Sequence, residues 1–282
     1  MMANGHPSGK RVIVCADDFA VHAAASLGIA ALARASRISA TSVMVLSPRW
    51  PQDVPLLQDL PQPIDVGLHL DWTSEFAIAA GHGMTLHAAM LKATLGGFGR
   101  GSAAAQTRAV IERQLDAFEA QWRAPPDYVD GHQHVQQFAG IREALVQTLI
   151  KRYGAAPGAM PYLRISRSPS GHVDLKSRVI AAMGASALEK LAAQAGLPAM
   201  TVLLGVYDFA GNQNRYSELM EAWLKAAPQR SIIMCHPALG SESPDLIGAA
   251  RLWEFDYLSG AQFPAALERA SVRIGRGISF DR

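Results

Sequence analysis

Aspartate, histidine and arginine side chains directly follow short apolar runs at several places in the chain. Asp17 and Asp18 come straight after the run RVIVCA. His69 follows IDVGL, and His236 follows SIIMC. The same position after an apolar run is taken by Asp130, His132, His134, Arg164 and Asp208. The strands of a (β/α) barrel all end on one face, which carries the active site. We therefore expect these side chains to converge.

The adjacent carboxylates Asp17 and Asp18 indicate a metal site. Two carboxylates at the end of a buried strand repel each other, which raises one pKa unless a cation lies nearby. A divalent metal ion bound by one of them, with His69 and His132 as nitrogen ligands, removes this problem. Two histidines and one carboxylate leave positions open for water and substrate, which is typical of catalytic metal sites. The ligand set suits Zn²⁺, whereas Mg²⁺ prefers more oxygen ligands.

A metal ion in this setting would acidify a bound water and polarise a carbonyl. The aspartate that does not bind the metal could then act as general base, and His236, on a distant strand, suits the role of general acid. Other assignments stay open. One aspartate could cap the following helix, and Arg164 could form a structural ion pair. His22 is interpreted as a solvated side chain.

His134 and Trp72 lie close in sequence to the proposed ligands. In extended backbone, residues two apart point to the same side, so His134 would lie beside His132 as a second ligand or a hydrogen-bonding partner. Trp72 is either a packing residue or an aromatic surface on which a sugar ring stacks.

The elements that must position these residues are short apolar runs alternating with longer helical patterns. Predicted strands are Arg11–Ala16, Ala40–Leu46, Ile64–Leu70, Tyr128–Asp130, Tyr162–Ile165, Met200–Val206, Ser231–Cys235 and Val272–Ile274. Predicted helices are Ala23–Ser36, Ala103–Trp122, Gly140–Tyr153, Asp174–Ala195, Tyr216–Ala227 and Gly260–Ala270. Such alternation predicts an α/β fold with a parallel sheet covered by helices.

Seven or eight strand–helix units in 282 residues favour a (β/α) TIM-like barrel over an open sheet. The chain is expected to form a single catalytic domain over residues 1–282. Residues 72–104 break the rhythm and are predicted to be a Gly-rich loop insertion that contains one helix at Leu86–Thr94.

The composition is that of a globular chain, with 49% hydrophobic and 18% charged residues. A net charge of +2 gives no reason to expect nucleic acid as a partner. The two cysteines, Cys15 and Cys235, lie in apolar runs, which favours a reducing compartment. With no signal-like segment and no membrane span, we expect a cytoplasmic protein. Its oligomeric state is open, with a homodimer as one option.

An ordered set of motifs resembles those of the YdjC-like carbohydrate deacetylases, which include chitooligosaccharide deacetylase and the hopanoid-associated deacetylase-like proteins. The motifs are ADDF at 16–19, GLHLDWT at 67–73, D-x-H-x-H-V at 130–135, CHP at 235–237 and a late R-x-x-E pair, Arg251 and Glu254. The resemblance implies an irregular (β/α) barrel of the polysaccharide-deacetylase type. It also implies removal of an N-acetyl group from an amino sugar, within an oligosaccharide or glycoconjugate, with one bound Mg²⁺ or Zn²⁺.

Matching motif to motif, the resemblance makes Asp18, His69 and His132 the metal ligands. It makes Asp17 the catalytic base and His236 the acid. Arg164 falls where an arginine would orient the base or contact substrate. We add His134, Asp130 and Trp72 to Arg164 as candidate substrate-binding residues.

The chain departs from the family pattern at Ala20, where glycine is usual, and at Gln133 and Gln136, where histidines stand in chitooligosaccharide deacetylase. These departures bear on chitobiose as substrate more than on hydrolysis. Two alternatives remain open: another metallohydrolase on the same scaffold, acting on a phosphoester or a different amide, and a sugar-binding barrel without turnover.

Overall fold

The computed structural model describes residues 9–155, 158–169, 175–242 and 244–279. The strands are β1 (Lys10–Phe19), β2 (Ala40–Val43), β3 (Asp65–Leu70), β4 (Tyr128–Gly131), β5 (Tyr162–Arg164), β6 (Ala199–Met200), β7 (Leu203–Leu204), β8 (Ile232–Cys235) and β9 (Val272–Ile274). The longer helices are α1 (Ala23–Arg34), α5 (Leu86–Thr94), α6 (Gly101–Trp122), α7 (Ile141–Tyr153), α8 (Leu175–Ala182), α9 (Ala185–Gln194), α10 (Gln213–Ala226), α11 (Gly248–Ser259) and α12 (Gln262–Arg269). Shorter segments are α2 (Trp50–Asp53), α3 (Pro55–Gln58), α4 (Glu75–Ala79) and the 3₁₀ turns η1 (His132–Gln137) and η2 (Gly277–Ser279).

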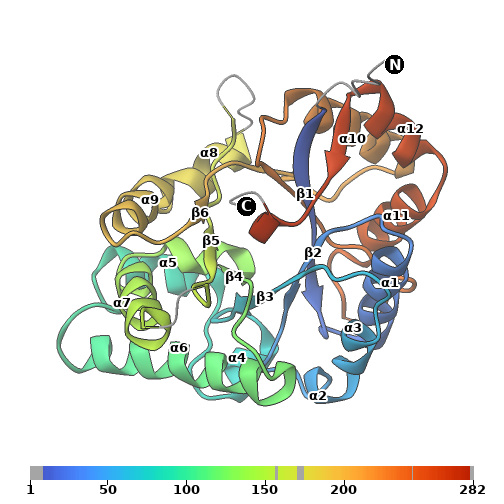
Figure 1. Cartoon of the computed structure of the whole chain (residues 1–282). Coiled ribbons are helices and arrows are strands. Elements are labelled where there is room, and N and C mark those ends of the chain that lie inside the picture. Colours follow the sequence, from blue (N-terminus) through green and yellow to red (C-terminus); the bar gives the residue numbers. More distant parts are fainter. Residues whose placement is uncertain (1–8, 156–157, 170–174, 243, 280–282) are drawn as a thin grey trace.

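All strand pairs are parallel, in the order β6-β5-β4-β3-β2-β1-β8-β7, with β9 beside β1. The strands curve into a nearly closed barrel in a single α/β domain, and helices surround them (Figure 1). The predicted fold class is confirmed. The barrel stays open between β6 and β7, which form no ladder with each other in the described part of the chain.

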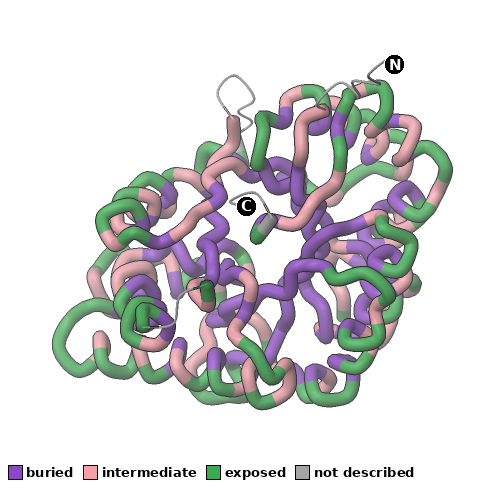
Figure 2. The backbone as a smooth tube through the Cα atoms, viewed as in Figure 1, coloured by how far each residue is buried: buried purple, intermediate pink, exposed green. Residues whose placement is uncertain are grey.

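The strand β1 shows how the barrel sorts its side chains. Val12 and Val14 belong to one apolar cluster, whereas Ile13 and Cys15 belong to a second. Successive strand residues point to opposite faces, so alternate β1 side chains pack against helices or fill the barrel interior. Figure 2 shows that the buried residues are concentrated in the strands, whereas the exposed residues lie on the outer helices and loops. Asp17 continues the interior series of Ile13 and Cys15.

Some element predictions are wrong. The predicted helix Asp174–Ala195 is two helices, α8 and α9, because the chain breaks at Gly184 with φ of +129°. The predicted strand Met200–Val206 is two short strands: β6 pairs with β5, and β7 pairs with β8. The segment 72–104 contains α4 in addition to the predicted helix at Leu86–Thr94, and α11 was not predicted.

Two further features that were considered from the sequence are the cysteines and the membrane-spanning segments. Cys15 and Cys235 are both buried and free, on the adjacent strands β1 and β8. Among the described residues, no helix has both the length and the apolarity needed to cross a bilayer.

Candidate metal centre and active site

The two aspartates at the end of β1 point in different directions. Asp17 and Asp18 are each only 2% exposed. Asp18 has a positive φ of +67°, and so does Ala20, with +71°. A left-handed residue turns the chain sharply, which separates the two carboxylates. Glycine, which is usual at the position of Ala20 in the family that the motifs resemble, adopts such angles without steric cost.

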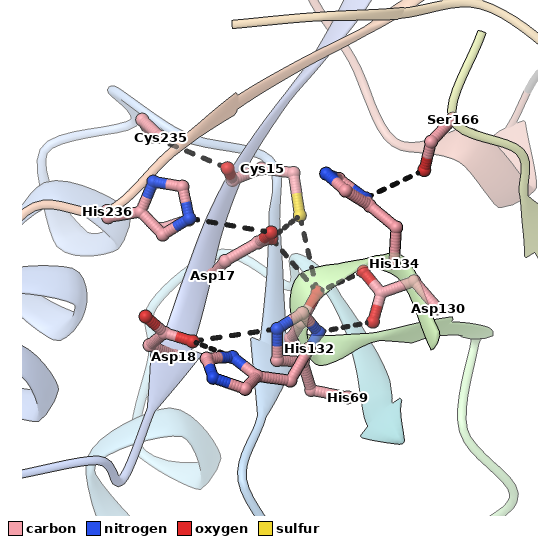
Figure 3. Close-up of polar contacts among 12 residues, drawn as sticks. Cys15, Asp17, Asp18, His69, Asp130, His132, His134, Ser166, Cys235 and His236 are labelled. Atoms are coloured by element: carbon pink, nitrogen blue, oxygen red, sulfur yellow. Dashed lines mark hydrogen bonds and ion pairs between the residues drawn. The ribbon is translucent and has the colours of Figure 1, made fainter. Parts of the chain in front are cut away.

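Asp18, His69 and His132 converge at the carboxyl ends of the strands (Figure 3). Asp18 Oδ1 lies 3.5 Å from His69 Nε2 and 3.3 Å from His132 Nδ1. One ligand atom from each of the three residues falls within 4.8 Å of the others. Asp18 Oδ1 is also buried without a hydrogen-bond partner in the described structure. A buried carboxylate oxygen left unpaired between two imidazoles fits a divalent cation.

His69 is held in the orientation that a metal ligand needs. Its Nδ1 lies 2.6 Å from Asp130 Oδ1, which leaves Nε2 facing Asp18. A carboxylate behind a ligand histidine fixes both its tautomer and its ring orientation. Burial alone would lower the pKa of this imidazole, but the carboxylates of Asp130, Asp17 and Asp18 together outweigh burial and raise this pKa to about 9.

Arg164 lies between two carboxylates in the barrel interior. It is fully buried, and its Nη1 and Nη2 donate to Asp17 Oδ1 and Oδ2 at 2.6 and 2.7 Å. Nη1 also lies 2.8 Å from Asp130 Oδ2. Burial would raise the pKa of Asp17, but the Arg164 guanidinium holds it well below its usual range. Asp17 is therefore ionised at neutral pH.

A second acidic group, formed by Cys15, Asp17 and Asp130, also brings ligand-type atoms together. Here Arg164 already occupies the space between them: Nη1 contacts Cys15 Sγ at 3.5 Å as well as both carboxylates. The guanidinium supplies the positive charge that a metal would bring. The group around Asp18 is therefore the better candidate for a metal ion.

His236 approaches the site from β8. Its Nε2 is 4.0 Å from Asp17 Oδ2, and its Nδ1 is buried without a partner in the described structure. The partly exposed ring of Phe209 meets the imidazole edge to face, with centroids 5.2 Å apart. Burial lowers the pKa of His236 to about 4, so the imidazole is neutral at pH 7.

The backbone from His132 to His134 was predicted to be extended, and this prediction is wrong. Both lie in the 3₁₀ turn η1, where Gln133 and His134 have positive φ. His134 lies on the interior side, with Nδ1 2.9 Å from Ser166 Oγ. Burial lowers the pKa of His134 to about 3. Gln136 is fully buried and donates to the carbonyl oxygen of Arg164 at 3.1 Å.

Three candidate substrate-binding residues lie away from solvent. Arg164 and Asp130 are fully buried, and Trp72 is 2% exposed. The Trp72 ring packs edge to face against His82 and Phe98. In this structure the three residues contact other protein groups. Arg164 contacts Asp17, and Asp130 contacts His69, so both support the site from behind.

Two residues that were not predicted as site residues contact its supporting groups. His22, interpreted as solvated, is 8% exposed, caps α1, and places Nε2 3.2 Å from Asp245 Oδ2. Ser42 Oγ donates to Asp130 Oδ2 at 2.6 Å. Neither had a sequence signal, because each contact depends on a partner far along the chain.

Comparisons with known proteins agree with this architecture. The family model described as "YdjC-like protein" matches residues 11–269. A crystal structure from Enterococcus faecalis V583, described as a "putative cellobiose-phosphate cleavage protein", superposes with a TM-score of 0.70 at 17% identity, covering 96% of this chain and 99% of that one. At this identity the likeness shows a shared fold.

A mutant of a CE4-family pseudoenzyme with restored enzymatic activity superposes with a TM-score of only 0.39 at 11% identity, covering 96% of this chain and 67% of that one. No curated protein is significantly similar in sequence.

Proposed function

We propose a function from the premise that this chain belongs to the YdjC-like protein family. The buried Asp and His cluster fits a metal-dependent hydrolase, and we propose that it removes an N-acetyl group from an amino sugar. The observation that carries the proposal is Asp18 Oδ1, buried and unpaired between His69 and His132. The substrate would be a small molecule or an oligosaccharide.

Asp18, His69 and His132 would hold one divalent ion, either Zn²⁺ or Mg²⁺. When bound, such an ion supplies Lewis acidity, which acidifies water and polarises a carbonyl oxygen. The protein prepares the three ligands beforehand. Asp130 fixes the ring of His69. Burial would raise the pKa of Asp18, but the Arg251 guanidinium and the neighbouring histidines hold it well below its usual range, so Asp18 stays ionised.

In the proposed reaction Asp17 accepts a proton from the attacking water. Its two-point pair with Arg164 orients both carboxylate oxygens. The same pair lowers the pKa of Asp17, so the carboxylate is available as an acceptor at neutral pH although it is a weak base. His236 Nε2, 4.0 Å from Asp17 Oδ2, is a nearby group that can accept this proton.

His236 would deliver a proton to the departing amine. Because its pKa lies near 4, it is neutral at pH 7 and must first take up a proton. Asp17 is the carboxylate that its Nε2 faces. We therefore propose that the proton taken from water moves from Asp17 to His236 and then to the amine nitrogen.

Phosphoester hydrolysis is the rival on the same scaffold. A phosphate group would need free positive charge near the metal. The two arginines of the site are already paired: Arg164 with Asp17 and Asp130, and Arg251 with Asp18 and Asp245. This pairing favours a neutral amide over a phosphoester.

A panel of N-acetylated mono-, oligo- and lipid-linked sugars, with phosphorylated sugars beside them, separates these reactions. Metal-stripped and metal-reconstituted protein would be assayed for acetate and phosphate release. Metal-dependent acetate release is the expected result. Phosphate release alone would replace the proposal, and bound metal without any turnover would revive the non-catalytic sugar-binding barrel.

A further inference from the structure

The helix α11 carries two buried ionisable side chains, and the proposed function gives no role to their contacts with the His236 backbone. Arg251 and Glu254 are 4% and 0% exposed. Residues three apart lie on the same face of a helix, and this face of α11 is turned towards the site. Burying a charge is costly unless it is well paired, so the contacts of these two residues indicate what they do.

Arg251 contacts both the proposed metal ligand and the proposed acid. Its Nη2 donates to Asp18 Oδ2 at 2.8 Å, and its Nη1 donates to the carbonyl oxygen of His236 at 3.4 Å. Its Nε donates to Asp245 Oδ2 at 2.8 Å. Asp18 Oδ2 is thereby fixed, and Asp18 Oδ1 is left facing the two histidines.

Glu254 holds the other backbone group of the same histidine. One carboxylate oxygen accepts a short hydrogen bond from the His236 backbone N–H. The other accepts from the Tyr207 hydroxyl at 2.7 Å. The N–H and C=O of His236 are therefore both bound by side chains of α11, one turn apart.

We propose that Arg251 and Glu254 form a positioning clamp that sets His236 and Asp18 relative to each other. The clamp rests on the proposed function, in which Asp18 binds the metal and His236 moves the proton. Glu254 acts on His236 alone, whereas Arg251 acts on both residues. The clamp gives the late R-x-x-E motif a physical role, because this spacing places both side chains on one face of α11, where they reach the N–H and the C=O of one residue.

The difference between the two residues defines the test. Arg251→Lys keeps the charge, but an ammonium cannot make the three directed contacts of the guanidinium. We expect it to weaken Zn²⁺ affinity about 10-fold and to lower kcat by a similar factor, as changes behind a metal ligand do. Zn²⁺ affinity is measured by competition with a chromophoric chelator, without substrate.

Glu254→Asp withdraws the carboxylate by one methylene and should lower kcat about 10-fold, with KM and Zn²⁺ affinity unchanged. Glu254→Gln can still accept from the His236 N–H and should restore most of kcat. Asp256→Asn makes the same acid-to-amide change on the exposed side of α11 and is the control. A general loss of packing would instead move metal affinity and kcat together in every Glu254 variant.

Two measurements test the clamp independently of acetate release: hydrogen exchange and Zn²⁺ affinity. Hydrogen exchange of the His236 amide should be slow in the wild type and in Glu254→Gln, and faster in Glu254→Asp. Zn²⁺ affinity should fall in Arg251→Lys alone. Unchanged Zn²⁺ affinity in Arg251→Lys, or unchanged His236 exchange in Glu254→Asp, overturns the clamp. A wild type without acetate release on the sugar panel overturns the proposed function instead.

Discussion

Arg164 and Asp17 form a two-point ion pair inside the barrel, with Nη1–Oδ1 and Nη2–Oδ2 distances of 2.6 and 2.7 Å. The arginine comes from β5 and the aspartate from β1. Such fork geometry fixes the carboxylate in its plane as well as its charge. A carboxylate held in this way keeps one orientation beside the group of Asp18, His69 and His132.

The first prediction concerns this carboxylate. Asp17→Asn should reduce acetate release by at least about 100-fold, because the amide cannot accept the proton. Metal should still bind, since Asp18, His69 and His132 are unchanged. Bound metal is measured by elemental analysis beside the assay. Full activity in this variant would remove Asp17 from the role of base.

Asp130→Asn tests whether Asp130 serves His69 or the substrate. The carboxylate is fully buried and lies 2.6 Å from His69 Nδ1. We expect metal affinity to fall about 10- to 100-fold, as for other partners of ligand histidines. KM at saturating metal should stay unchanged. A raised KM with normal metal affinity would instead support the substrate-binding role predicted from the sequence.

His132→Ala is the cleanest test of the metal centre. Its side chain is 23% exposed, whereas that of His69 is 3% exposed, so truncation disturbs less of the core. We expect loss of metal binding and of activity, with little change in the thermal unfolding midpoint of the metal-stripped protein. Metal titration by calorimetry checks the first effect. Stoichiometric, tight binding by this variant would contradict the ligand set.

The fold, and the convergence of the side chains in the candidate site, could be predicted from the sequence because both follow one local rule. Asp17, Asp18, His69 and His236 each end or directly follow an apolar strand, and parallel barrel strands end on one face. Which of the site's residues pair with each other follows no local rule. The pair Arg164–Asp17 joins residues 147 positions apart and depends on how the barrel curves.

The helix α11 shows why other parts could not be predicted. Its buried face includes Arg251 and Glu254 beside Ala250, Tyr257 and Leu258. Charged residues in the buried stripe remove the apolar periodicity that identifies an amphipathic helix. The charged residues that contact the site are therefore the reason why α11 was not predicted. The strands β6 and β7 were predicted as one strand for another reason. A short apolar run does not indicate which neighbouring strand each part pairs with.

Trp72→Phe separates packing from sugar stacking. The indole is 2% exposed and lies against Phe98 and His82. We expect the smaller ring to cost about 1–2 kcal/mol of unfolding free energy, because it leaves a cavity. KM should not change. Urea unfolding and initial rates measure the two effects, and a raised KM without loss of stability would favour a stacking role.

The final prediction is a pH dependence caused by Glu254. Burial raises the pKa of this fully buried carboxyl from 4.5 to about 7. The folded state therefore binds more protons than the unfolded state between these pH values. The resulting stabilisation is complete below pH 4.5 and is lost as pH rises through 7. It is on the order of 3 kcal/mol at most.

Glutamine at position 254 cannot ionise, so the variant Glu254→Gln should not lose this unfolding free energy as the pH rises. Between pH 5 and pH 8, the metal-stripped wild type should lose about 2–3 kcal/mol more unfolding free energy than Glu254→Gln. Urea unfolding at the two pH values measures the difference. Asp256→Asn removes an exposed carboxyl from the same helix and should follow the wild type. If wild type and Glu254→Gln lose stability in parallel, Glu254 is ionised in the folded protein throughout this range, held so by Arg251 and its hydrogen bonds.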